Sequence, residues 1–381
     1  MRIAHIITGL EVGGAESFLS RLLVPLSARH SCEVISLTTR GHFASRIEAS
    51  GTPVRALGMT AASAPVKLIE LVRYLRKSRP DAVHTWMYHA DLLGGVAARL
   101  AGVPAVFWNV RLTKLAAEHN KRSTIQVARA SALLSKVVPD KIVCCATAAR
   151  DSHVKMGYDA RKMLVIPNGI DTERFRPDSN ARRVCRATIG ATDQTPVVGM
   201  VGRFNPQKNY RGFLEMAAAL LKRHPETIFV LAGPGVEESN PTIREWIAEF
   251  DLASRIRLLG VRSDLELVLP GLDVFVSSSH DEGFPNAVAE AMACGVPAVV
   301  TDAGDSAHVV GATGICVPVN DPDKLCSALD NLLGEGDELT ARGASARLRI
   351  IREFSLATAA SSYISLYESG CHDDVAHQAN A

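Results

Sequence analysis

The chain has 381 residues, of which 47% are hydrophobic and 22% charged, and its formal net charge is +2 at pH 7. This length exceeds one ordinary hydrophobic core and the composition is typical of a globular protein, so we expect two domains rather than a disordered or fibrous chain. There is no apolar run of about 18 residues, no secretion signal and no C-x-x-C pair among the eight cysteines, which disfavours a spanning helix, a disulfide framework and a metal site.

The first predicted elements are a strand over residues 2–8, a glycine loop and a helix over 16–29. The loop reads G-x-x-x-G-G rather than G-x-G-x-x-G, and no acid ends the second strand, 32–37, so a nicotinamide or flavin enzyme is disfavoured. Gly13 and Gly14 would still let a ligand approach the backbone closely. From this loop alone, a plain strand-to-helix turn is an equally good interpretation.

Strand-like and helical runs then alternate, which is typical of a doubly wound α/β domain. Strands are predicted at 53–57, 81–86, 104–108, 141–146 and 163–166, and helices at 68–77 and 92–100. Ligands of such sheets bind beyond the carboxyl ends of the strands. Two of these ends carry the polar or aromatic residues His84, Tyr88, His89, Asp91, Asn109 and Arg111. They fit either an acceptor-binding wall or a set of structural hydrogen bonds, and the pattern does not separate the two.

The positive charge is concentrated in the first half of the chain. Residues 1–175 contain 24 of the 42 Lys and Arg residues but only 13 of the 40 Asp and Glu residues. This half is therefore expected to meet something anionic, such as a phospholipid surface, a lipid diphosphate or a nucleic acid. Basic residues over 114–141 surround an apolar helical stretch, which fits an amphipathic segment on a membrane as well as an ordinary half-exposed helix.

A turn-rich stretch, PNGIDTERF at 167–175, and polar residues up to 194 mark a domain boundary. The second half then begins with a strand over 196–201, the loop GRFNPQKN and a helix over 210–223. Arg203 and Lys208 of this loop would meet a diphosphate at the carboxyl end of the strand. Two further strands are predicted at 228–231 and 256–259.

The next unit is a strand over 272–279, an acidic loop, a helix from Pro285 and a strand over 298–301. A helix N-terminus attracts phosphates, whereas the carboxylates of Glu282 and Glu290 would accept hydrogen bonds from hydroxyls. A ligand with both groups is a nucleotide sugar. Two acids by themselves would more simply be exposed to solvent. Arg203 and Lys208 in the loop after the first strand of the second half favour the interpretation as a ligand site. No Asp-x-Asp pair or His cluster predicts a metal at this edge.

Taken together, the chain resembles the family 4 retaining glycosyltransferases, whose GT-B fold has two Rossmann-like doubly wound parallel-sheet domains facing across a cleft. The resemblance covers nearly the whole chain. It rests on GGAES, PNGIDTERF, GRFNPQKN, LLGVRSD and DEGFPNAVAEAMACGVPAVVTDAG, in which Glu282 and Glu290 match the family's E-x7-E signature.

The resemblance implies a role for each matching residue. Glu282 would contact the donor sugar, Glu290 the ribose, and Arg203 with Lys208 the diphosphate. The implied donor site consists of Gly13, Gly14, Arg203, Lys208, Gly260, Val261, Arg262, Glu282, Gly283, Phe284, Pro285, Asn286 and Glu290.

The resemblance has a gap where the family often carries a cleft histidine in a TFH-like turn. This chain reads FWNVR there, so Asn109 or Arg111 stands at that place, and His89 is the substitute that we predict. The implied catalytic residues are Arg203, Lys208, Glu282 and His89. The implied acceptor-binding residues are His84, Tyr88, Asn109 and Arg111.

The implied domains are an acceptor domain over 1–174, a donor domain over 175–353, a helix over 354–369 that crosses back to the first domain, and a disordered tail over 370–381. The implied reaction moves a sugar from a nucleotide-diphosphate sugar to a glycan or lipid-linked acceptor in surface polysaccharide or glycolipid assembly. It needs neither metal nor cofactor.

We expect reduced cysteines in a cytoplasmic protein with a peripheral contact on the inner face of an anionic membrane, and no nucleic acid partner. Two alternatives remain, a nucleotide-sugar epimerase of the same fold and a non-catalytic scaffold. A phosphorylase would need a pyridoxal lysine site, which the sequence does not show.

Overall fold

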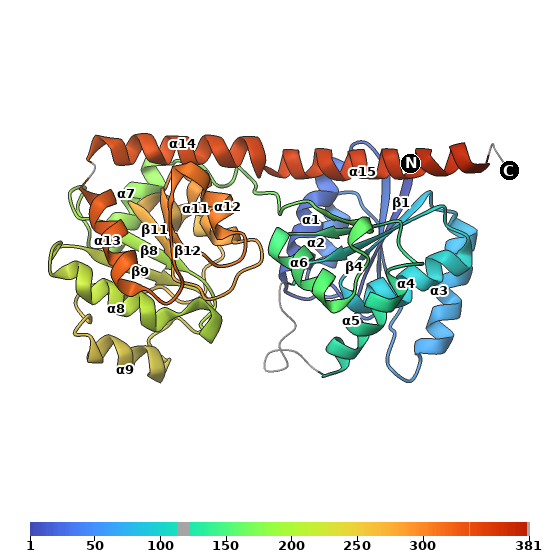
Figure 1. Ribbon diagram of the computed structural model, residues 1–381, viewed down its shortest axis with the longest axis horizontal. Coiled ribbons are helices and arrows are strands. Elements are labelled where there is room, and N and C mark those ends of the chain that lie inside the picture. The colour runs from blue at the N-terminus through green and yellow to red at the C-terminus, as the bar shows by residue number, and fades with distance from the viewer. Residues whose placement is uncertain (113–121, 335, 379–381) are drawn as a thin grey trace. The chain divides into compact units, whose positions relative to one another are not determined.

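The computed structural model describes residues 1–112, 122–334 and 336–378, with the backbone alone for 337 and 371–378. Two compact units divide the chain, and the first contains both ends of it. Unit 1 is Met1–Gly169 with Leu356–Ala381, and unit 2 is Ile170–Ser355. These boundaries lie a few residues from the sequence-based ones at 174 and 353. Each unit is a parallel sheet with helices on both faces (Figure 1).

Unit 1 is built on seven parallel strands in the order β3-β2-β1-β4-β5-β6-β7. The strands are β1 Arg2–Ile7, β2 Ser31–Ser36, β3 Val54–Ala56, β4 Ala82–Trp86, β5 Ala105–Val110, β6 Lys141–Cys144 and β7 Met163–Val165. The helices are α1 Gly14–Ser27, α2 Ala44–Ala49, α3 Ala64–Ser78, α4 Tyr88–Ala101, α5 Arg122–Leu134, α6 Thr147–Met156 and α15 Leu356–Gln378. The strand order reverses direction at β1, as in doubly wound sheets.

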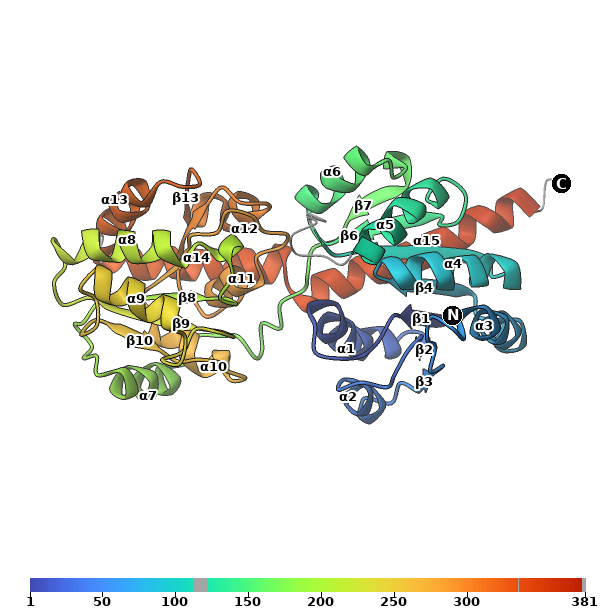
Figure 2. The ribbon, with the colours of Figure 1, turned by 90° about the horizontal axis from the view of Figure 1, so that it is seen from below.

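The two faces of the unit 1 sheet are covered by different helices. Helices α3, α4 and α5 contact one another in turn along one face (Figure 2). On the other face α1 packs against α15, and apolar residues of both helices share one core with β1, β4 and β5. Phe18, Leu19, Leu22 and Leu23 of α1 are buried because they recur at helical spacing on one side.

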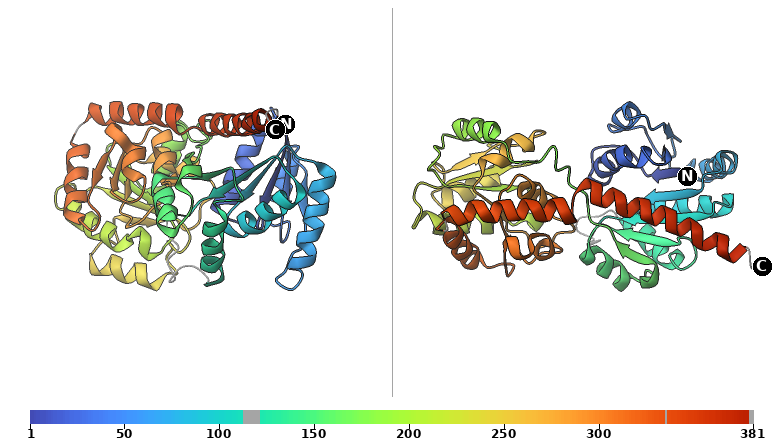
Figure 3. Two further views of the ribbon diagram at one scale, coloured as in Figure 1. Left: turned by 45° about the vertical axis from the view of Figure 1, so that its right-hand side comes forward. Right: turned by 90° about the horizontal axis from the view of Figure 1, so that it is seen from above.

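Helix α15 is the dark red helix that lies across the strands of unit 1 in Figure 3. It begins at Leu356 and continues to Gln378, past Gly370, at which sequence analysis placed the start of a tail. The last three residues of that predicted tail lie outside the described part of the chain. None of the helices that the structure describes is long and apolar enough to cross a membrane.

Unit 2 is built on six parallel strands in the order β10-β9-β8-β11-β12-β13. The strands are β8 Val197–Val201, β9 Ile228–Ala232, β10 Ile256–Leu258, β11 Val274–Ser277, β12 Ala298–Thr301 and β13 Ile315–Val317. The helices are α7 Ser179–Ile189, α8 Tyr210–Leu221, α9 Pro241–Glu249, α10 Leu265–Val268, α11 Asn286–Ala293, α12 Ser306–Val310, α13 Pro322–Leu333 and α14 Asp337–Glu353. Sequence analysis did not predict β13, nor the helices α7, α9, α10, α12, α13 and α14, and it treated the residues of α7 as part of a polar domain boundary.

The unit around α11 folds as its sequence signals indicate. Pro285 is the N-cap residue, so the helix begins at Asn286, one position later than we predicted. Gly295 follows the helix with φ +79°, a left-handed conformation that glycine adopts without strain. Val288, Ala289 and Met292 are buried, and α14 packs along this helix. Helix α11 is thereby fixed between β11 and β12.

Candidate functional site

Five loops meet at the carboxyl edge of the unit 2 sheet, after β8, β9, β10, β11 and β12. Backbone hydrogen bonds join them: Gly202 N to Ala232 O at 2.9 Å, Phe204 N to Pro234 O at 2.8 Å, Gly233 N to Gly260 O at 2.7 Å and His280 N to Gln207 O at 2.7 Å. The loops hold one another in place, which gives the side chains on them defined positions. Nine of the thirteen predicted donor-site residues lie on these loops, and Asn286 and Glu290 follow on α11.

Two glycines allow the loops to approach this closely. Gly304 has φ +57°, and a Cβ atom there would lie 1.9 Å from the carbonyl oxygen of Glu282. Gly233 has φ +140°, and a Cβ atom there would lie 2.0 Å from the carbonyl oxygen of Gly202. Both positions therefore need glycine for the backbone angle and for the space.

Lys208 and Glu282 form an ion pair at this edge. The Nζ atom lies 2.5 Å from Oε1, and the two side chains are 23% and 11% exposed. Lys208 ends a 3-10 turn, Pro206–Lys208, that is capped by the Asn205 side chain, which accepts from Lys208 N at 3.1 Å. The pair thus joins the loops after β8 and β11 and brings together two residues that sequence analysis assigned to one ligand site.

A row of hydroxyl groups lies behind the Glu282 carboxylate. Ser279 donates its hydroxyl to Oε1 of Glu282 at 2.7 Å, and the hydroxyls of Ser277 and Ser279 lie 3.2 Å apart. Thr301 donates to the carbonyl oxygen of Ser279 at 2.5 Å. All three hydroxyl residues are buried. Sequence analysis missed Ser279, although the SSS run before the acidic loop was visible.

The other predicted donor residues have surroundings that differ from one residue to the next. Arg203 is exposed on the loop that carries Lys208, and Glu290 is half-buried one turn into α11. The guanidinium of Arg262 is engaged by Asp264, with Nη2 2.7 Å from Oδ2. Phe284 is buried against Phe354, with ring centroids 5.7 Å apart, so its contribution to a ligand would come from the backbone.

At the carboxyl edge of the unit 1 sheet, Gly13 and Gly14 begin α1. A Cβ atom on Gly13 would lie 2.2 Å from Oε2 of Glu16, so this carboxylate occupies the space beside the helix N-terminus. Burial raises the pKa of Glu16, against the opposing effects of its own backbone N–H and of Arg111. Sequence analysis did not single out Glu16, although it is the acid of the GGAES motif.

Two predicted acceptor-binding residues are core residues instead. His84 is fully buried, and its Nδ1 lies 2.7 Å from the hydroxyl of Tyr367 in α15. Tyr88 is 1% exposed, and its hydroxyl lies 2.8 Å from Nε2 of His153 in α6. We therefore do not retain His84 or Tyr88 as acceptor ligands, because neither side chain has surface left for one.

Asn109 is also buried, but it orients the exposed side of this edge through Arg111. Nη1 of Arg111 donates to Oδ1 of Asn109 at 3.3 Å, and Nη2 donates to Oδ1 of Asn168. The guanidinium carbon lies 4.2 Å from the ring centroid of Phe18. Arg111 is half-buried and is the cation that the structure holds in place at this strand end.

His89 and Asp91 belong to the first turn of α4. His89 is half-buried, and burial lowers its pKa. Asp91 is fully buried and accepts from the Thr85 hydroxyl at 2.6 Å, and burial raises its pKa well above the ordinary value. Asp91 is therefore a buried structural acid beneath the edge, in surroundings that disfavour its charged form. Among the described residues there is no group of three His, Cys, Asp or Glu side chains with the geometry to hold a metal.

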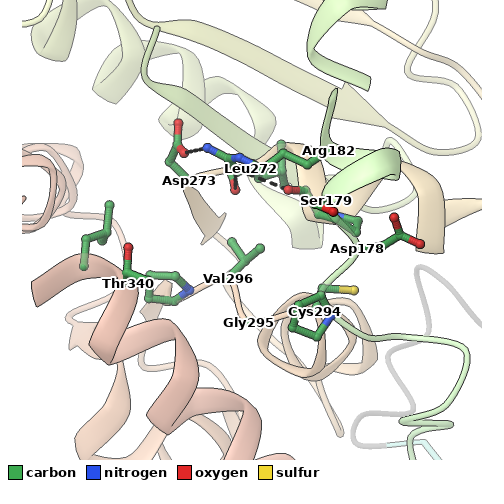
Figure 4. A pocket seen from close by; sticks show the side chains of 13 residues that line it. Asp178, Ser179, Arg182, Leu272, Asp273, Cys294, Gly295, Val296 and Thr340 are labelled. Atoms are coloured by element: carbon green, nitrogen blue, oxygen red, sulfur yellow. Dashed lines mark hydrogen bonds and ion pairs between the residues drawn. The ribbon is translucent and has the colours of Figure 1, made fainter. Parts of the chain in front are cut away.

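A separate pocket lies at the opposite edge of unit 2, by the amino ends of β11 and β12 (Figure 4). Arg182 and Asp273 line it and pair with each other at 2.6 Å. Asp273 also accepts from Val197 N at 2.8 Å, so this carboxylate fixes the sheet. None of the predicted site residues lines this pocket.

Comparison with known proteins places both units in one group. Residues 12–174 match the family described as Glycosyltransferase Family 4, and residues 195–335 match Glycosyl transferases group 1. The chain is 32% identical over 295 residues, 76% of it and 75% of the relative, to the Escherichia coli UDP-Gal:alpha-D-GlcNAc-diphosphoundecaprenol alpha-1,3-galactosyltransferase. It is 30% identical over 212 residues, 54% of it and 60% of the relative, to the lipopolysaccharide core biosynthesis mannosyltransferase LpsB of Rhizobium meliloti (strain 1021).

The structure is similar to that of Anabaena Alr3699/HepE in complex with UDP. The TM-score is 0.84 at 20% sequence identity, over 97% of this chain and 100% of that one. This likeness, with a seven-stranded and a six-stranded parallel sheet, confirms the predicted GT-B fold class.

Proposed function

The chain belongs to glycosyltransferase family 4 and acts on nucleotide sugars in glycolipid or polysaccharide biosynthesis, and from this premise we propose a more specific reaction. In this reaction the protein transfers a hexose from a UDP-sugar to a hydroxyl of a sugar that is carried on a polyprenyl diphosphate. The anomeric configuration is retained, and no metal takes part. The Escherichia coli relative supports the choice, because its name specifies UDP-galactose and a diphosphoundecaprenol acceptor.

The observation that carries the proposal is the ion pair of Lys208 and Glu282 at the carboxyl edge of unit 2. A diphosphate competes with Glu282 for the ammonium group, and sugar hydroxyls then donate to the released carboxylate. Arg203 lies five residues from Lys208 on the same loop and supplies a second positive charge. The diphosphate of one UDP-sugar thus binds Lys208, and its sugar hydroxyls bind Glu282.

The proposed chemistry is retaining and proceeds on one face of the sugar. The bond between the anomeric carbon and the diphosphate oxygen breaks as the acceptor oxygen bonds to the same face. The acceptor proton passes to the leaving diphosphate. Lys208 and Arg203 stabilise the negative charge that develops on that diphosphate, and Glu282 and Glu290 hold the sugar and the ribose.

Acceptor recognition is proposed at the unit 1 edge, around Arg111 and His89. The guanidinium of Arg111 is oriented by Asn109 and Asn168, and its planar donors suit a phosphate. A diphosphate next to the acceptor sugar supplies the anion that the basic first half of the chain is expected to meet.

We extend the proposal to a peripheral contact with the inner face of an anionic membrane, where such an acceptor resides. Leu133 of α5 and Val137 just after it are 74% and 69% exposed, and Arg129 and Lys136 are exposed beside them. Exposed apolar and basic side chains together suit a lipid surface. The basic residues at 114–121, which belonged to the same predicted segment, lie outside the described residues. Sedimentation with phosphatidylglycerol vesicles, but not with phosphatidylcholine vesicles, tests this contact.

The reaction is tested with the purified chain and three donors, UDP-galactose, UDP-glucose and GDP-mannose. Each is mixed with α-D-GlcNAc-diphosphoundecaprenol, the product is weighed by mass spectrometry, and its anomeric configuration is determined by NMR. One UDP-sugar is expected to add a hexose in α linkage, with the same rate in excess chelator. Donor conversion without an acceptor would instead identify an epimerase, and the absence of both transfer and donor binding would identify a scaffold.

A further inference from the structure

Helix α15 sends two tyrosine hydroxyls into the buried polar layer of unit 1. Tyr363 and Tyr367 are one helical turn apart, and both are fully buried. Asn109 donates from Nδ2 to the Tyr363 hydroxyl at 2.8 Å. The Tyr367 hydroxyl lies 2.7 Å from Nδ1 of His84. The same helix therefore makes the same kind of contact with two neighbouring strands, β5 and β4.

Only one of these contacts leads on to the edge of the sheet. Asn109 accepts with Oδ1 from Nη1 of Arg111 at 3.3 Å, and Arg111 donates with Nη2 to Asn168. A continuous row of hydrogen bonds thus runs from Tyr363 through Asn109 to the guanidinium of Arg111. His84, in contrast, is surrounded by the rings of Trp86, Tyr363 and Phe107.

The direction of the bonds gives Tyr363 a specific effect. A side-chain amide has an accepting end and a donating end, and only the carbonyl end attracts a guanidinium. The Tyr363 hydroxyl accepts from Nδ2 of Asn109 and so keeps the carbonyl turned toward Arg111. Without that acceptor, the Asn109 amide is free to turn its N–H groups toward Arg111, and these groups would repel the guanidinium.

We propose that Tyr363 is a positioning residue for acceptor binding, because it fixes the Asn109 amide that aims Arg111. The C-terminal helix thereby completes the acceptor site of unit 1 without touching the acceptor. This inference rests on the proposed role of Arg111 in holding the acceptor diphosphate.

The test compares Tyr363→Phe with Tyr367→Phe in the full chain. Each change removes one buried hydroxyl from the same helix and keeps the ring, so the second variant is a matched control for structural effects. Transfer from UDP-galactose to α-D-GlcNAc-diphosphoundecaprenol is measured with each substrate varied in turn. Tyr363→Phe is expected to raise the acceptor KM roughly fivefold, as for one lost hydrogen bond, and to leave the donor KM within about twofold. Tyr367→Phe should change neither KM.

A second pair of variants keeps the proposal testable if Tyr363→Phe folds poorly. Asn109→Ala breaks the same row from its other side and should raise the acceptor KM by a similar factor. In an Arg111→Ala chain, Tyr363→Phe should add no further rise, because the group that it positions is gone. Equal acceptor KM values for Tyr363→Phe and Tyr367→Phe would overturn the inference while leaving the acceptor site intact. An unchanged acceptor KM in Arg111→Ala would overturn the acceptor site itself.

Discussion

The ammonium nitrogen of Lys208 lies 2.5 Å from Oε1 of Glu282, although the two residues are 74 positions apart in the chain. One follows β8 and the other follows β11, and these strands are neighbours in the sheet. In the absence of a ligand, each residue neutralises the other in a largely buried place. The pair therefore holds the two loops in one arrangement before the proposed nucleotide sugar binds.

Replacing Lys208 with Ala should lower kcat roughly a hundredfold, because one fixed positive charge would be missing as the diphosphate leaves. Steady-state transfer from the UDP-sugar gives the measurement. Lys222→Ala, at an exposed lysine after α8, serves as the control and should retain full activity. Near-normal transfer by the Lys208 variant would contradict the role given to this residue.

Ser279→Ala removes the hydroxyl that donates to Glu282 at 2.7 Å. If Glu282 holds the sugar, UDP-galactose should bind roughly tenfold more weakly, the loss expected for a hydrogen bond to a charged group, whereas UDP alone should bind almost as before. Calorimetric titration with the two ligands separates these effects. Ser327→Ala on the surface of α13 is the control. Equal weakening of both ligands would show that Ser279 acts on the whole loop instead.

Gly304→Ala should destabilise unit 2 and displace the loop of Glu282. The position has φ +57°, and the new Cβ atom would lie 1.9 Å from the Glu282 carbonyl oxygen. We expect a loss of about 2 kcal/mol or more in unfolding free energy, together with weaker donor binding. Gly334→Ala is the matched control, because its φ is −79° and its nearest neighbours lie at 3.4 Å. Denaturant unfolding that finds the two variants equally stable would rule out this strain.

The stability of unit 1 should fall as the pH is lowered from 6.5 toward 3. Burial, with the charge of His30, lowers the pKa of His5 to about 3, and burial also lowers that of His84 far below its ordinary value. Unfolded histidines bind protons below about pH 6.5 while these two do not, so acid favours the unfolded chain by about 1.4 kcal/mol for each at pH 5.5.

Thermal unfolding at pH 7.5 and 5.5 measures this effect, with an expected fall of roughly 5 °C or more. His84→Asn, which keeps an amide facing Tyr367 and does not titrate, should show a smaller fall. A melting temperature that stays constant over this range would mean that the two histidines bind protons in the folded protein as readily as in the unfolded chain.

The arrangement of the loops that carry Lys208 and Glu282 could be predicted largely from the sequence. The apolar strands, the turn residues around 202–209 and the Pro285 and Gly295 signals are local features, and parallel strands bring their carboxyl ends to one edge. That geometry is why Lys208 and Glu282 could be expected together. The role of Ser279 could not be predicted, because a serine near a strand end has many possible partners and its orientation depends on the fold.

The acceptor half was harder to predict for a physical reason. His84 alternates with Val83 and Thr85 along β4, which fixes the face of the strand on which it lies. The alternation does not show what covers that face. The cover is α15, whose Tyr367 lies 283 residues further along the chain. No local pattern connects the two, so a buried histidine and a ligand-binding histidine look alike in the sequence. Arg111 was singled out in the sequence because it lies at the strand end itself, and its part in acceptor binding stays a proposal.

The assembly of unit 1 from both ends of the chain also has a consequence for biosynthesis. On the ribosome, β1 to β7 emerge before unit 2, and the apolar rings of Trp86 and Phe107 stay uncovered until residues 356–378 have been synthesised. At typical rates of translation, the intervening Ile170–Ser355 takes roughly 10 to 40 s to make. During that time a newly made chain exposes an apolar, aggregation-prone aromatic surface. A prematurely terminated chain exposes this surface permanently. The segment that completes unit 1 is thus translated after the whole of unit 2.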